Sequence, residues 1–82
     1  MVTGMGYGIK ERMHAAHVNF SSLLREQAPS LSKRDSERLA NYYVAKRLAK
    51  LDPVMGRITV KHGAYWEPDV ILKAFDMMQQ EA

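Results

Sequence analysis

Apolar side chains recur at helical spacing in the first part of this chain. Over residues 9–27 they lie three, four and one positions apart, which places them on one face of a helix. The residues of this face are Ile9, Met13, Ala16, Phe20, Leu23 and Leu24. Ala28 precedes Pro29, and a residue before proline resists the α conformation, so the helix is predicted to end near Gln27.

Two further helices are predicted downstream. The first covers residues 33–51, with Ser32 as its N-cap, and it ends at Asp52–Pro53. Its apolar stripe contains Ala40, Val44, Leu48 and Leu51, with Tyr43 on the flank. The second begins at Pro68, because proline suits the first turn of a helix, and it ends near Gln80. Its apolar residues are Val70, Ile71, Ala74, Phe75 and Met78.

The segment between these helices favours β structure. Residues 57–66 are rich in β-branched and aromatic side chains, and His62–Gly63 can serve as a two-residue turn. This register pairs Val60 with Tyr65 and Thr59 with Trp66. The alternative is a single strand followed by a loop.

The predicted fold class is therefore α+β, a small single domain of three helices and a short β-hairpin in the order α-α-β-β-α. Residues 1–8 have glycine at positions 4, 6 and 8, and ordering glycine costs backbone entropy. We therefore expect a flexible N-terminal tail over residues 1–8 and one compact domain over residues 9–82. A chain of 82 residues lies near the lower limit of what one apolar core can stabilise.

Composition narrows the function classes. The count of 0 cysteines excludes disulfides, thiolate metal sites and a cysteine nucleophile. No apolar run is long enough to cross a membrane, and residues 1–10 lack the pattern of a signal peptide, so a cytoplasmic location without membrane contact is expected. The net charge of +3 arises from residues 29–52, which contain six cationic and three acidic side chains.

The sequence argues against catalysis. No serine lies in a glycine-rich elbow, and each acid lies at a predicted helix end or in a charged stretch rather than in an apolar pocket. His14 and His17 share a helix face and could join His62 or Glu11 at a metal, but their spacing does not force convergence. We therefore expect a non-enzymatic protein with no cofactor and no metal.

A row of cations is the most informative pattern on the second predicted helix. Residues at steps of four form one ridge, about 24 Å long, that could follow a phosphate backbone. The ridge contains Arg34, Arg38, Tyr42, Lys46 and Lys50, and Lys61 and His62 could add a second contact from the hairpin turn. This pattern supports nucleic-acid binding as the alternative function. The simpler interpretation is that these residues form the solvated face of an amphipathic helix.

Aromatic residues support protein docking as the main functional hypothesis. Tyr, Trp and Arg anchor protein interfaces, and Trp66 or Tyr42 could do so beside Arg38 or Lys46, while Tyr43 and Tyr65 suit the core. We predict a small accessory or regulatory protein that docks on a protein partner, an inhibitor from a mobile element being one such role. Self-association through the helix stripes is compatible with either function.

Overall fold

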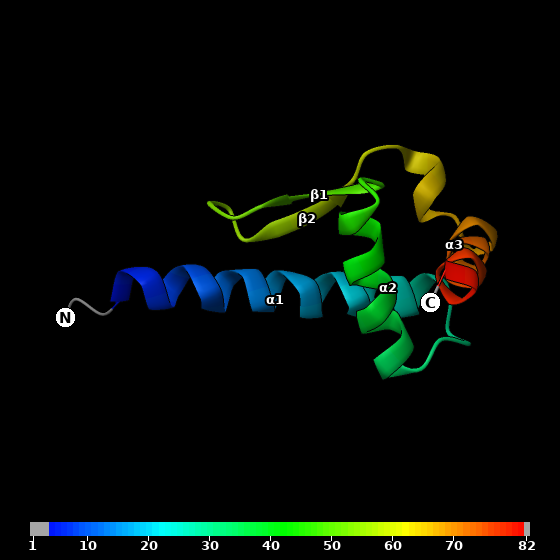
Figure 1. Ribbon diagram of the computed structural model, residues 1–82, viewed down its shortest axis with the longest axis horizontal. Helices are drawn as coiled ribbons and strands as arrows, with labels where there is room; N and C mark the ends of the chain where they lie inside the picture. Colours follow the sequence, from blue (N-terminus) through cyan, green and yellow to red (C-terminus); the bar gives the residue numbers. More distant parts are fainter. Residues whose placement is uncertain (1–3, 82) are drawn as a thin grey trace.

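The computed structural model describes residues 4–81, and it describes side chains from Gly8 onward. It contains three α-helices and a two-stranded antiparallel hairpin, which confirms the predicted α+β class and the order α-α-β-β-α (Figure 1). The helices are α1 (Gly4–Gln27), α2 (Lys33–Ala45) and α3 (Pro68–Glu81). The hairpin consists of β1 (Ala49–Asp52) and β2 (Arg57–Val60), and a 3₁₀ helix, η1 (Gly63–Trp66), follows it.

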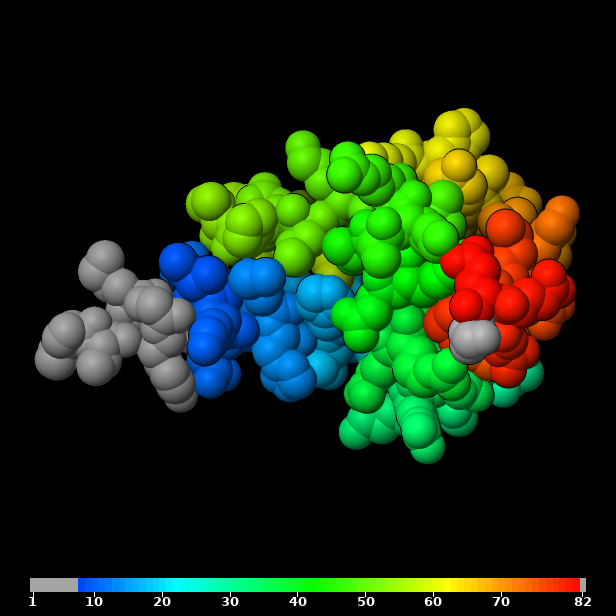
Figure 2. Space-filling model, viewed as in Figure 1, coloured from blue at the N-terminus to red at the C-terminus, as the bar shows by residue number. Residues whose placement is uncertain are grey.

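Helix α1 begins five residues before its predicted start at Ile9. Residues 4–8, predicted as part of a tail, are helical, and residues 1–3 lie outside the described part of the chain. Once packing has formed the later turns, each added residue gains a backbone hydrogen bond without a new nucleation step, and this overcomes the glycine penalty. The hairpin tip lies against this end of α1, where the Arg12 guanidinium donates a 3.3 Å hydrogen bond to the Val54 carbonyl oxygen. In Figure 2 the hairpin accordingly lies directly against the N-terminal half of α1.

Helix α2 starts as predicted and ends earlier. The Ser32 hydroxyl accepts a 3.0 Å hydrogen bond from the Asp35 amide, which confirms the N-cap. The predicted end at Leu51 is wrong, because the chain leaves the helix after Ala45. Arg47 adopts a left-handed backbone with φ 63°, and the Leu48 amide donates to the Tyr43 carbonyl oxygen at 2.8 Å. This is a Schellman C-cap with arginine where glycine is usual.

The hairpin also differs from the predicted one. Its strands pair Ala49 with Val60 and Leu51 with Ile58, so the predicted pairing of residues 59 and 60 with Trp66 and Tyr65 is wrong. The turn spans residues 53–56, in which Gly56 has φ 66° and the Asp52 side chain accepts hydrogen bonds from two turn amides. Pro53 therefore ends a strand rather than a helix.

The core lies where α1, α2, α3 and the hairpin meet. Phe20 and Leu24 of α1 pack there as predicted, whereas Ile9 and Leu23 of the same predicted stripe are exposed. The N-terminal part of α1 reaches past α2 and α3 (Figure 1). Tyr43, expected on the flank of α2, is fully buried. Its ring contacts Phe20 at a centroid distance of 5.8 Å, so an aromatic pair joins α1 to α2.

Candidate functional site

The predicted basic ridge does not exist as one helix face. Arg34, Arg38 and Tyr42 lie on α2, but Lys46 is its C-cap residue and Lys50 lies in β1. The early end of α2 at the Schellman motif turns the chain away before the ridge is complete. The prediction of five aligned residues along one helix is therefore wrong.

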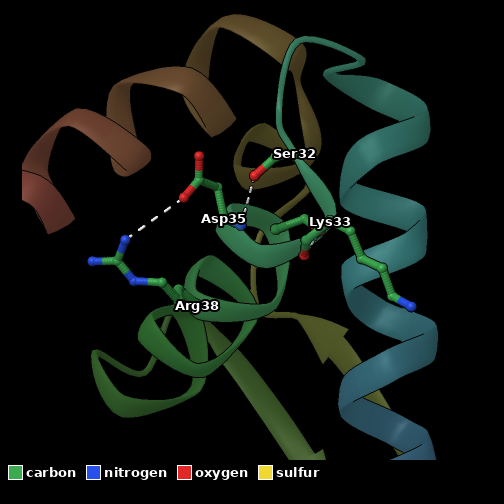
Figure 3. A network of polar contacts seen from close by, with 5 residues as sticks. Ser32, Lys33, Asp35 and Arg38 are labelled. Carbon is green, nitrogen blue, oxygen red and sulfur yellow. Dashed lines mark hydrogen bonds and ion pairs between the residues drawn. The ribbon is translucent and has the colours of Figure 1, made fainter.

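Two of the ridge cations also have acidic neighbours. The Arg38 guanidinium lies 3.6 Å from the Asp35 carboxylate (Figure 3), and the Lys46 ammonium lies 2.7 Å from Glu81. Glu81 also accepts a 2.8 Å hydrogen bond from the Tyr42 hydroxyl, which ties the end of α3 to α2. The hydrogen bond with Lys46, followed by that with Tyr42, lowers the pKa of Glu81, and the bond to Glu81 raises the pKa of Lys46. The contacts of Glu81 thus join α3 to the end of α2, whereas the pair of Arg38 and Asp35 lies within α2.

The other predicted site residues have separate positions. Lys61 is exposed after β2, and the His62 ring accepts a 3.1 Å hydrogen bond from the Ala64 amide, so it caps η1. Trp66 is half-buried, with its ring 5.7 Å from that of Phe20. Trp66 is therefore anchored to α1 while part of its surface meets solvent.

The outer face of the hairpin carries three of the cations that form no ion pair among the described residues. Ala49, Leu51, Ile58 and Val60 turn toward the core, so the alternating residues face solvent. Three of these solvent-facing residues are Lys50, Arg57 and Lys61, with Thr59 between the last two. None of the three cations forms an ion pair within residues 8–81.

Strand β2 has one open edge. The Lys61 amide donates to the Leu48 carbonyl oxygen at 2.9 Å, which fixes the phase of the antiparallel ladder. Hydrogen-bonded pairs alternate along such a ladder, so Thr59 forms main-chain hydrogen bonds to β1. The N–H and C=O groups of Ile58 and Val60 then point away from β1. No other hydrogen bond among the described residues reaches those groups. The edge therefore presents unpaired N–H and C=O groups in the arrangement that a further strand requires.

An apolar groove runs beside this edge. Its walls come from β2, α1 and η1, and no residue of β1 contributes, so it lies on the open side of the strand. The part nearest η1 has a volume of about 290 Å³ and is lined by Phe20, Leu23, Ile58, Thr59, Val60 and Trp66. Leu23 is 43% exposed and forms the outer wall. We call this combination the edge groove: the open edge of β2 with Phe20, Leu23 and Trp66.

The histidines do not assemble with acids into a metal centre. His17 donates from Nδ1 to the Met13 carbonyl oxygen at 2.9 Å, a contact within α1. Across the part of the chain that the structure describes, no three His, Asp or Glu side chains are grouped to hold a metal ion.

Comparisons with protein-family models, with curated proteins and with solved structures found no match to this chain. Of the helices between residues 4 and 81, none has the length and apolar character that crossing a membrane would demand.

Sequence reasoning identified Trp66 and Lys61 but missed most of the edge groove. Leu23 fits the helical spacing of the predicted core stripe, and the predicted hairpin pairs Thr59 and Val60 with the next segment. The spacing Ile58–Thr59–Val60 did signal a strand with two faces. Its open edge depends on the choice of partner strand, which local patterns do not determine.

Proposed function

We propose that this protein is a small non-enzymatic accessory protein that docks on a protein partner through the edge groove. The observation that carries the proposal is the juxtaposition of the unpaired main-chain groups of Ile58 and Val60 with the apolar wall formed by Leu23 and Trp66. An added strand could form main-chain hydrogen bonds on one side and bury its alternate side chains on the other. This is the physical basis of recognition by β-augmentation.

The main-chain groups of this edge have no hydrogen-bond partner outside the hairpin among residues 4–81, which supports a binding role. Proteins commonly cover or blunt the edges of their sheets, because unpaired strands recruit other chains. Here the edge borders a groove between β2 and α1. Ile58 is 7% exposed on the β2 side, whereas Leu23 on the α1 side is 43% exposed and keeps apolar surface in solvent. Burying such surface on binding contributes roughly 25 cal/mol per Å² before the costs of association.

Nucleic-acid binding is less well supported. The hypothesis of nucleic-acid binding depends on four cations along one helix, and two of them, Arg38 and Lys46, have acidic partners in the structure. The cations of the hairpin face, Lys50, Arg57 and Lys61, remain as a basic surface, with Asp52 on the same face. Duplex DNA is therefore a comparison ligand in the experiments below.

A peptide-display selection with two matched variants tests the docking proposal. Leu23→Glu places a charge in the groove wall, whereas Val18→Glu places one at a similarly exposed position of α1, 36% exposed, outside the groove. We expect peptides selected on the unmodified protein to lose most of their affinity for Leu23→Glu and to retain it for Val18→Glu. Circular dichroism confirms that both variants are folded. Selection of no peptides, or equal effects of the two variants, would reject the edge groove as the docking site.

A further inference from the structure

The edge groove also has a chemical preference that follows from the register of β2. Side chains of an added strand lie on the same face as the residues they oppose. Those opposite Ile58 and Val60 therefore enter the apolar groove, and those opposite Arg57 and Lys61 meet two unpaired cations on the outer face. This preference rests on the proposed docking function and makes it more specific.

We propose that the partner segment is an extended strand with the pattern acidic, apolar, any residue, apolar, acidic. The two apolar side chains contact Phe20, Leu23 and Trp66, and the two acids pair with Arg57 and Lys61 across the strands. The pattern is the same in both directions, so it applies to a parallel or an antiparallel strand. Its central residue lies beside Thr59.

The same charges argue against a second copy of this chain as the occupant. Two copies related by a twofold axis would pair their β2 edges antiparallel, with Thr59 of one copy opposite Thr59 of the other. In this arrangement the free main-chain groups of Ile58 in one copy lie opposite those of Val60 in the other. Arg57 of each copy would then lie opposite Lys61 of the other. Like charges directly opposite each other destabilise a strand pair, so the edge disfavours itself and favours an acidic partner.

Synthetic peptides test this pattern directly. The probe is Gly-Ser-Glu-Val-Thr-Val-Glu-Ser-Gly, and two control peptides replace either both glutamates by lysine or both valines by serine. Binding is followed by the fluorescence of Trp66, the single tryptophan of the chain, and by the amide NMR signals of Ile58 and Val60. At low salt we expect the lysine peptide to bind about tenfold more weakly than the probe, and the serine peptide to lose binding. The charge preference should shrink as salt is raised.

Charge reversal on the protein completes the experiment. Arg57→Glu combined with Lys61→Glu should reverse the preference, so that the lysine peptide binds more tightly than the probe. Lys33→Glu with Arg34→Glu changes the net charge equally on α2, away from β2, and should preserve the original preference.

The outcomes separate this inference from the docking function. If the probe and the lysine peptide bind alike, or if reversing Arg57 and Lys61 leaves the preference unchanged, the acidic pattern is wrong. Display-selected peptides that still depend on Leu23 would then leave the docking function standing. If neither the probe nor a selected peptide binds, both proposals fail. Duplex DNA binding more tightly than the probe, and losing affinity on the same charge reversal, would overturn the acidic-peptide inference and assign the hairpin face to nucleic acid.

Discussion

The Tyr43 hydroxyl donates a 2.8 Å hydrogen bond to the carbonyl oxygen of Tyr65, linking the buried last turn of α2 to η1. Because η1 also carries Trp66, this bond helps to hold one wall of the edge groove in place. Tyr43 itself is fully buried against Phe20, so the groove wall is anchored to the core.

Removing this hydroxyl should destabilise the fold. Tyr43→Phe leaves the Tyr65 carbonyl oxygen without its donor, and we expect the free energy of unfolding to fall by about 1–2 kcal/mol. Tyr42→Phe is the matched control, because its hydroxyl bonds to exposed Glu81, and its effect should be smaller. Urea unfolding followed by Trp66 fluorescence measures both variants. Equal losses in the two variants would show that the Tyr43–Tyr65 bond has no special role.

Tyr43 should ionise only at a pH well above the usual range of a tyrosine. Desolvation raises its pKa to about 12. Because the pKa of Tyr43 is higher in the folded than in the unfolded state, the neutral phenol stabilises the fold. This contribution is complete below the unfolded pKa near 10 and is lost as pH rises through about 12. We expect a late phenolate absorbance step that coincides with loss of helical circular dichroism. The step should be absent in Tyr43→Phe, and a late step that persists there would contradict the assignment.

The contact between Lys46 and Glu81 should be visible in the titration of Glu81. The hydrogen bond from Lys46 is the main cause that lowers the pKa of this carboxyl group. Lys46→Met should therefore raise the pKa of Glu81, and Tyr42→Phe should raise it less. In the unmodified protein the stabilising contact is present at neutral pH and is lost as pH falls through the lowered pKa. Carboxyl-carbon NMR measures the shifts, and an unchanged pKa in Lys46→Met would disprove the pairing in solution.

The left-handed backbone of Arg47 offers a stabilising substitution. A non-glycine residue in this region is strained, so Arg47→Gly should raise the free energy of unfolding by about 1 kcal/mol. Ala45→Gly, two residues earlier at the last residue of α2, should lower it, by less than the roughly 1 kcal/mol of a helix interior. Thermal unfolding of the two variants compares them directly. A loss of stability in Arg47→Gly would contradict the C-cap geometry.

Local signals account for the parts of the fold that the sequence predicted. Ser32 caps α2, and Pro68 opens α3, because both act on the backbone within a few residues. The end of α2 was missed because arginine, not glycine, takes the left-handed position. Strand β1 was missed because Ala49, Lys50 and Leu51 fit a helix as well as a strand.

The candidate site depended on these non-local features. Lys50 and Lys61 were identified as cations, but their common face follows from the register of β1 with β2. The open edge follows from the same register. Local patterns give no information on which segment pairs with Ile58 and Val60. They therefore predict which residues are cationic or apolar, but not which of them come together in the edge groove.

Amide hydrogen exchange at β2 tests the central claim most directly. In the free protein we predict rapid exchange at Ile58 and Val60, whose amides face the open edge, and slower exchange at Thr59, whose amide bonds to β1. Saturating the protein with the acidic peptide should slow exchange at Ile58 and Val60 and leave Thr59 nearly unchanged. Slow exchange at Ile58 and Val60 in the free protein, or no change on binding, would show that the edge is not where a partner strand adds.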